Sequence, residues 1–203
     1  MSEELSTELK ILEAAKKVFL AKGFSGCTTR EIAHEAGENV ALVNYYFRSK
    51  AALFDQVFQS AIEELMYILV DIFKSDISLK EKIAEFIDRE YAFISSFPGL
   101  PMFILSELNR EDGAQLKNKQ MFEMVANSGV FDQMKEAQES GEMIEIDLYG
   151  ITVLLMSNCH YPFISKNFVS SLLGVADEHF ETLMDAHKIH VKNMILTYLF
   201  PIK

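Results

Sequence analysis

Residues 28–54 read TTREIAHEAGENVALVNYYFRSKAALF and combine two short helical patterns with a glycine between them. Thr28 and Glu31 have the spacing of a capping box, which predicts that a helix begins at the residue after Thr28. Gly37 can adopt the left-handed conformation that ends a helix, and Asn39 is a suitable N-cap for a second helix that ends at the YYF sequence. Two short helices joined by a tight, glycine-containing turn are typical of a helix-turn-helix, whose second helix fits the DNA major groove.

The second helix of this motif has two different faces. Val40, Val43 and Phe47 recur at i, i+3 and i+7, which is the spacing of a stripe that packs against the first helix. Asn44 and Tyr45 fall on another side, where their polar groups could bond phosphates or base edges of DNA. The pattern also fits a small helical hairpin whose polar residues only face water, so the motif alone leaves both interpretations open.

The first 65 or so residues resemble the DNA-binding domain of TetR-family transcriptional regulators. The resemblance rests on a helix that leads into AAKKVFLAKGFSGCTTREIA, on the AG turn that follows, and on YYF-x-SK before a long helix. It implies an all-α fold with an N-terminal three-helix helix-turn-helix domain, residues 1–48, and a larger helical ligand-binding and dimerisation domain, residues 49–203. Two positions depart from the family pattern, because Asn44 stands where a tyrosine is usual and Ala41 where a glycine is common.

The resemblance also implies roles for individual residues, carried over by position. The residues that would contact phosphates are Thr29, Asn44, Tyr46 and Lys50. Those that would approach base edges are Arg30, Val40, Ala41, Leu42 and Tyr45. The implied partner is double-stranded DNA with a palindromic operator, since a twofold dimer presents two such motifs.

The bulk composition describes a globular chain whose acidity lies outside the motif. The 203 residues are 49% hydrophobic and 24% charged, with only four prolines and nine glycines, which excludes a disordered chain and favours helices. Residues 1–50 contribute nothing to the net charge of −11, because they hold seven Lys/Arg and seven Asp/Glu. We therefore expect a modest salt dependence of DNA binding, with Arg30, Arg48 and Lys50 as the main ionic partners.

Apolar spacing predicts a series of helices after the motif. A helix over 49–73, capped by Ser49, links the two domains, and a loop or short helical turn is expected over 166–176. The segment 146–165 is apolar on nearly every side, which predicts a helix that is buried all round. No segment has the roughly 20 apolar residues of a membrane span and the N-terminus lacks a secretory pattern, so the expected location is the cytoplasm. The other predicted helices are 6–22, 79–96, 101–110, 115–140 and 177–199.

The last predicted helix carries an apolar seam that has two interpretations. The seam can pack onto its own domain, or it can form a four-helix homodimer interface with the preceding apolar helix and the same pair from a second copy. Resemblance to the TetR family favours the second interpretation. The expected interface residues are Leu154, Leu155, Phe180, Leu183, Met184, His187, Val191, Met194, Ile195 and Tyr198.

The middle of the chain is rich in methionine and phenylalanine. Side chains of this kind form ordinary cores, but they also line adaptable cavities for apolar ligands. In the TetR family this region usually holds a small-molecule pocket, so we expect some of these residues to line one for an unidentified apolar ligand. The expected pocket residues are Met66, Phe93, Phe97, Met102, Phe103, Met121 and Met124.

No constellation of catalytic residues is found in the sequence. It lacks a nucleophile elbow, a phosphate-binding glycine loop and a zinc-binding helix motif, and His187 and His190 lack a convincing further metal ligand. We therefore expect no enzyme activity, no metal and no cofactor. The sequence predicts a homodimeric DNA-binding regulator, most simply a repressor released by a small apolar ligand. The alternative is a helical carrier or sensor of small molecules whose N-terminal module binds protein.

Overall fold

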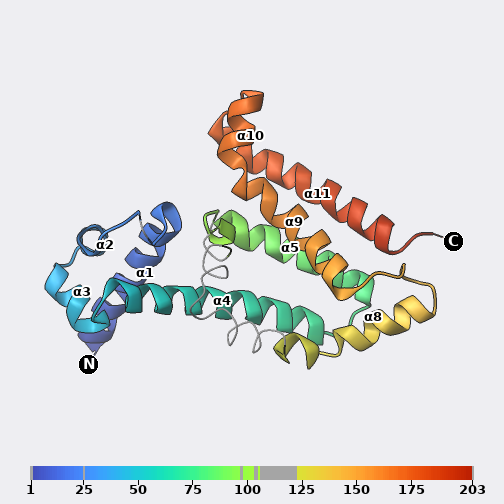
Figure 1. Ribbon diagram of the computed structural model, residues 1–203, viewed down its shortest axis with the longest axis horizontal. Helices are drawn as coiled ribbons and strands as arrows, with labels where there is room; N and C mark the ends of the chain where they lie inside the picture. Colours follow the sequence, from blue (N-terminus) through green and yellow to red (C-terminus); the bar gives the residue numbers. More distant parts are fainter. Residues whose placement is uncertain (1, 25, 97, 103–104, 106–122, 203) are drawn as a thin grey trace. The chain divides into compact units, whose positions relative to one another are not determined.

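The computed structural model describes residues 2–24, 26–96, 98–102, 105 and 123–202, and these form two compact units (Figure 1). The first unit, here called the head, comprises the described residues up to Leu65 together with Met102 and Leu105. The second, here called the body, comprises the described residues from Met66 to Pro101 and from Glu123 to Ile202. Helix α4 (Lys50–Lys74) continues from one unit into the other.

The head is built from α1 (Ser2–Lys22), α2 (Thr29–Ala36), α3 (Val40–Phe47) and the first part of α4. Each helix contributes an apolar stripe to a shared core. Phe19 of α1 is fully buried and meets Phe54 of α4 edge to face, with 4.9 Å between the ring centroids. Phe24, in the loop after α1, contacts Phe54 in the same way. This aromatic cluster joins α1 to α4 in the core of the head, next to the two short helices.

Local side-chain caps set the ends of the short helices. The Thr28–Glu31 capping box is present in full, and Gly37 ends α2 with φ of +69°. The side chain of Asn39 accepts a hydrogen bond from the amide of Leu42 at 2.9 Å, and this bond begins α3. Ser49 accepts one from the amide of Ala52 at 3.1 Å. The capping predictions made for Thr28, Asn39 and Ser49 are therefore confirmed.

The connection between α3 and α4 is a strained turn. Arg48 has φ of +62° and ψ of −43°, and the amide of Ser49 donates to the carbonyl of Phe47 at 2.6 Å. This is the geometry of a classic γ-turn, which is rare because a side chain crowds the backbone there. Through this turn α4 begins with only two residues, Arg48 and Ser49, between it and the end of α3.

The body is a helical layer in which α5 (Leu79–Ser96), α9 (Leu148–Ile164) and α11 (Phe180–Leu199) pack on one another (Figure 1). Helix α8 (Val130–Glu139) packs on α5. The short α10 (Lys166–Leu173) and the 3-10 turn Asp177–His179 connect α9 to α11. The buried core includes Ile87 of α5, Cys159 of α9 and Ile195 of α11. The described residues contain no strand, as the all-α prediction required.

Three predictions for the body are corrected by the structure. The helix expected over 115–140 is interrupted, because residues 127–129 form a turn and Gly129 has φ of +80°. Residues 166–173 form a full helix, α10, where a loop or short turn was expected. Helix α9 is not buried all round, since Tyr149 is 78% exposed and Tyr161 is 59% exposed. Apolar composition does not distinguish a side that faces the core from one that faces outward.

No helix of the described part of the chain combines the length and apolar character that crossing a membrane requires.

Candidate nucleic-acid interface

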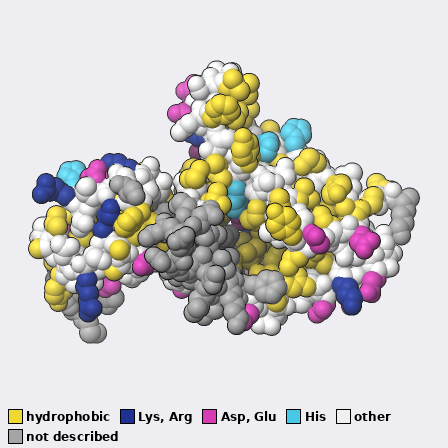
Figure 2. Space-filling model, in the orientation of Figure 1, with side chains coloured by type: hydrophobic (Ala, Val, Ile, Leu, Met, Phe, Trp, Pro, Cys, Tyr) yellow, Lys and Arg dark blue, Asp and Glu magenta, His cyan; other side chains and the backbone are white. Residues whose placement is uncertain are grey.

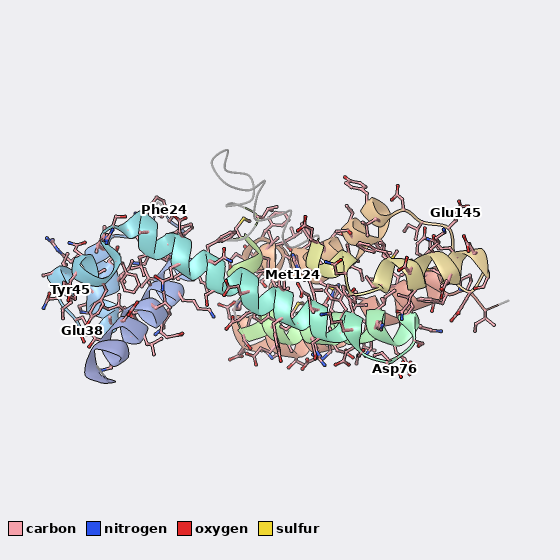
Figure 3. The ribbon with its side chains drawn as sticks, turned by 90° about the horizontal axis from the view of Figure 1, so that it is seen from below. Phe24, Glu38, Tyr45, Asp76, Met124 and Glu145 are labelled. Atoms are coloured by element: carbon pink, nitrogen blue, oxygen red, sulfur yellow. The ribbon has the colours of Figure 1, made fainter. Side chains whose placement is uncertain are left out.

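Helix α3 is anchored on one side and open on the other. Val43 and Phe47 are buried in the core of the head, with 1% and 4% of their surfaces exposed. On the open side lie Ala41, Asn44 and Tyr45, and the Tyr45 ring is 73% exposed. Figure 3 labels Tyr45 at the end of the head that carries this helix. The prediction that α3 presents an amide and an aromatic side chain outward is therefore confirmed.

The open face is rigidified by an aromatic ladder. The rings of Tyr45 and Tyr46 meet edge to face with 5.1 Å between centroids, and Tyr46 lies 6.4 Å from Phe47. Tyr46 is half-buried, whereas Tyr45 before it is exposed and Phe47 after it is buried. An exposed tyrosine that leans on an anchored one loses less rotamer freedom when it binds a partner, because its position is already restricted.

Lys50 is held inside the head more firmly than its sequence position indicated. Its Nζ donates to the carbonyl oxygens of Phe24 at 2.7 Å and Cys27 at 2.9 Å, and it lies 4.3 Å from the centroid of the Phe24 ring. The ammonium has three N–H groups, so one is left for a phosphate. Lys50 thus ties the start of α4 to the loop between α1 and α2, a contact across more than 20 residues that no local pattern reveals.

Most other lysines of the head form ion pairs. Lys17 pairs with Glu35 at 2.6 Å and Lys22 with Glu31 at 2.7 Å. The hydrogen bond from Lys22 and those from the Thr28 amide and hydroxyl lower the pKa of Glu31 to about 2. Glu31 therefore stays ionised and keeps both the capping box and the Lys22 pair in place at neutral pH.

Two arginines of the head carry unneutralised charge. Arg30, at the start of α2, and Arg48, between α3 and α4, are exposed and form no salt bridge with any residue that the structure describes. Figure 2 shows Lys and Arg side chains in dark blue on the head. Arg30 lies in the first turn of α2 and Arg48 directly follows α3, so both arginines belong to the helix pair that carries Tyr45.

The structure brings all the residues predicted to contact DNA into the head. Ala41, Asn44, Tyr45 and Arg30 are exposed. The half-buried members are Thr29, Val40, Leu42, Tyr46 and Lys50. They come from α2, α3 and the first residue of α4, as the helix-turn-helix pattern required. Their individual roles toward phosphates and bases remain predictions.

The residues predicted to line a ligand pocket have mixed environments. Met66 is 4% exposed and Phe93 is half-buried, whereas Met102 and Met124 are 50% and 47% exposed. Phe97, Phe103 and Met121 lie outside the described residues. The pocket therefore remains a prediction.

The residues predicted for the dimer interface divide into two groups. Leu155, Phe180, Val191 and Ile195 are buried in the core of the body, each less than a tenth exposed, so they cannot form a surface for a second copy. Leu183, Met194 and Tyr198 are exposed by 44%, 50% and 55%. The half-buried remainder comprises Leu154, Met184 and His187. The predicted seam thus mixed a core stripe with an outer stripe of the same helix.

The neighbouring helix α9 also exposes large apolar and aromatic side chains. Tyr149, Val153 and Tyr161 of α9 are exposed by 78%, 45% and 59%. With Leu183, Met194 and Tyr198 of α11 they make up a set here called the outer face. Exposed apolar groups on two packed helices are typical of a protein contact. The sequence contained this signal in Tyr149 and Tyr161, which the buried-helix interpretation of α9 concealed.

A buried polar cluster in the body was missed by sequence reasoning. Nε2 of His160 lies 2.5 Å from Oε1 of Glu90, which is 1% exposed. Next to it the Tyr91 hydroxyl bonds the carbonyl of Asn158 at 3.1 Å and lies 2.7 Å from Nδ1 of His187. Burial raises the pKa of Tyr91 and, together with the nearby His190, lowers that of His187. His187, considered from sequence as a metal ligand, thus bonds a tyrosine.

Comparisons with known proteins agree with this architecture. Residues 11–57 match the model of a family described as bacterial regulatory proteins, tetR family. The chain is 26% identical over 190 residues to YttP of Bacillus subtilis, a probable HTH-type transcriptional regulator, covering 84% of this chain and 83% of that protein. It is 27% identical over 177 residues to NicS of Pseudomonas putida, an HTH-type transcriptional repressor, covering 83% and 81%.

A solved structure shares the fold over most of the chain. The regulator FadR from Bacillus subtilis, solved in complex with stearoyl-CoA, aligns with a TM-score of 0.63 at 17% identity, over 90% of this chain and 96% of that one. The matched segment 11–57 includes the helices α2 and α3 that form the open face. The chain is therefore similar to TetR-family transcriptional regulators, both in the segment 11–57 that matches the family model and in its overall fold.

Proposed function

We propose that this chain is a homodimeric transcriptional repressor that places α3 in the major groove of a palindromic operator. The observation that carries the proposal is the open face of α3, where a Tyr45 ring that is 73% exposed sits on a helix whose opposite side is locked into the core. A helix fixed in this way can enter a groove without being reshaped. The relative NicS is itself named a repressor.

The head would make two kinds of contact with DNA, one to phosphates and one to base edges. Thr29, Asn44, Tyr46 and the remaining N–H of Lys50 would bond phosphates and set the register of the head on the duplex. Base edges would be read by Arg30, Val40, Ala41, Leu42 and Tyr45. Arg30 is the one arginine of this second group, and arginine paired with guanine is the commonest specific contact in the major groove.

The proposed dimer uses the outer face of the body. Packing the exposed stripes of α9 and α11 against the same stripes of a second copy would cover Tyr149, Tyr161, Met194 and Tyr198. A twofold contact of this kind is closed, so it yields a dimer with two heads. Two heads that bind together multiply the affinity of one.

Ligand control would follow from the linkage between the two units. A ligand that binds the body in one tilt of α4 changes the spacing between the two heads of a dimer. To move the population decisively, the ligand must favour one state by about 5.5 kcal/mol. FadR, which shares the fold, was solved with stearoyl-CoA, a molecule with a long apolar chain. An apolar effector is therefore the starting expectation for this body.

The direct test is fluorescence polarisation with the duplex that lies upstream of the gene encoding this chain, against a shuffled duplex. We expect tighter binding to the upstream duplex by about a thousandfold or more, the usual lower limit for specific binding. Three cations per head and two heads give a log-log salt slope near −5, at about 0.9 per phosphate. Equal affinity for both duplexes, or a slope steeper than about −8, would contradict the proposal.

A further inference from the structure

One carboxylate oxygen of Glu90, in the body, accepts no hydrogen bond from any residue that the structure describes. Glu90 is 1% exposed, and its Oε1 is bonded to His160. Its Oε2 is buried and has no hydrogen-bond partner among the described residues. A buried acceptor without a donor costs free energy that folding alone does not recover, so each such group in a native structure requires an explanation.

The cations on and around α5 are committed elsewhere. Nζ of Lys82 donates to the Phe73 carbonyl and to the side chain of Gln133, at 2.9 and 2.8 Å. Lys192 binds both carboxylate oxygens of Asp88, at 2.8 and 2.7 Å. Arg89 pairs with Asp71 and Glu85. Among the residues that the structure describes, no lysine or arginine pairs with Glu90, and His160 is its hydrogen-bond partner.

Glu90 lies on a helix whose neighbouring core positions are apolar, and its histidine partner lies partly at the surface. Ile87 and Ile94 on α5 are buried, and so is Cys159 on α9. Burial raises the pKa of the Cys159 thiol, and the nearby Glu90 raises it further. The side chain of His160 is 20% exposed, whereas that of Glu90 is only 1% exposed, so the pair meets the surface at the imidazole alone. An apolar wall with one acidic acceptor is the usual composition of a small-molecule site.

We propose that Glu90, held by His160, is the polar anchor of the effector site, and that the effector carries a protonated amine on an apolar body. The ammonium would donate to Glu90 Oε2, and the apolar body would lie against the core side chains of α5 and α9. A charge-assisted hydrogen bond to a buried carboxylate discriminates strongly against ligands that bring an anion. This inference refines the proposed ligand-controlled repressor by naming the class of ligand, which then differs from a purely apolar one.

The test compares three probes with one apolar body, 4-phenylbutylamine, 4-phenylbutanol and 4-phenylbutyrate, by calorimetric titration into the full chain without DNA at pH 7. We expect the amine to bind at least about tenfold more tightly than the carboxylate, as charge-assisted bonds require. Glu90→Gln should reduce this preference to about threefold or less. The control is Glu145→Gln, which changes an exposed carboxylate of the same unit and should keep the preference (Figure 3).

A purely structural role for Glu90 gives different results. If Glu90 only holds the body together, Glu90→Met should lower the thermal midpoint. If it is an anchor kept for a ligand, Glu90→Met should leave the midpoint unchanged or raise it, since buried ion pairs are often replaced by apolar groups without loss. Amine binding that is absent, or equally strong in Glu90→Gln, would overturn the inference.

The DNA arm separates this inference from the proposed function. Amine binding without specific DNA binding would support the ligand class while removing the repressor. Specific DNA binding without amine binding would support the repressor and overturn the inferred class of ligand. If both hold, the amine should weaken operator binding of the wild-type chain and leave that of Glu90→Gln nearly unchanged.

Discussion

The bonds that cap the short helices of the head are local, whereas the side-chain bonds that join the long helices of the body span distant positions. In the head, Thr28 with Glu31, Asn39 with Leu42 and Ser49 with Ala52 all bond over three residues. In the body, Lys82 reaches Gln133 over 51 positions, Glu90 reaches His160 over 70, and Lys192 reaches Asp88 over 104. Local bonds shape short helices, whereas distant ones hold long helices in a chosen packing.

This difference matches the proposed roles of the two units. A head that binds DNA must present the same helix in the same place. Local caps achieve this with only a few neighbouring residues for each helix end. A body that responds to a ligand can be rebuilt around other pairs without altering the head.

The largest effect is expected when a charge is placed on the outer face of the body. Tyr198→Asp puts a carboxylate on the α11 stripe of each copy, where Tyr198 is 55% exposed in the single chain. At about 2 kcal/mol per copy, the dimer dissociation constant should rise about a thousandfold. Sedimentation equilibrium measures it, and Tyr67→Asp, at a tyrosine of α4 that is 76% exposed, is the matched control. An unchanged dimer would remove the outer face as the interface.

A smaller effect is expected at the head. Tyr45→Ala deletes a ring that is 73% exposed without touching the core, so the thermal midpoint should stay the same. Operator affinity should fall about tenfold to a hundredfold, as loss of a base-edge contact costs about 1–3 kcal/mol. Polarisation with the operator duplex is the measurement, with Tyr67→Ala as control. A loss of stability in place of affinity would show that Tyr45 serves the fold.

The strained turn links the stability of the head to its charge. Arg48→Gly should stabilise the chain by about 1 kcal/mol, because glycine tolerates φ of +62° without strain. The same change removes one cation per head, so the salt slope of a dimer should flatten by about 2. Arg48→Ala, which removes the cation and keeps the strain, should flatten the slope without the gain in stability. Denaturant titration measures the free energy of unfolding, and DNA binding at increasing salt concentrations measures the slope.

The smallest effect concerns pH and compares two capping boxes. The pKa of Glu31 is lowered to about 2 from an ordinary value of 4.5, first by Lys22 and then by Thr28. Its stabilising contribution is therefore complete above about pH 4.5 and is lost as the pH falls toward 2. Glu31→Gln should lower the thermal midpoint modestly at pH 6 and not at pH 2.

The second capping box, Ser78 with Glu81 in the body, is the control for this prediction. Bonds from Ser78 alone lower the pKa of Glu81, and no lysine takes part. Glu81→Gln should show a similar dependence on pH that added salt changes little, whereas salt should weaken the Glu31 effect. Equal salt sensitivity in the two boxes would contradict the role given to Lys22.

The sequence predicted the head well because its signals are local. Thr28, Gly37 and Asn39 each specify a cap within a few residues of themselves, and the structure has all three. The hold of Lys50 on Phe24 and Cys27 was not visible, because it joins elements more than 20 positions apart. The strain at Arg48 was also hidden, since arginine gives no sign of a positive φ.

The body was predicted less well for the same physical reason. Helical spacing identified α11, but it could not distinguish Val191 and Ile195, which face the core, from Met194 and Tyr198, which face outward. Glu90 and His160 are 70 positions apart, so nothing in either local sequence links them. Their pairing becomes apparent only when α5 and α9 are packed together.

In the proposed dimer, two copies of the open face of α3 read a symmetric DNA sequence. Selection of duplexes from a random pool by the full-length wild-type chain tests this claim most directly. We predict enrichment of an inverted repeat, and loss of that enrichment with Tyr45→Ala but not with Tyr67→Ala. Recovery of no common sequence, or of the same sequence by the Tyr45 variant, would contradict the claim.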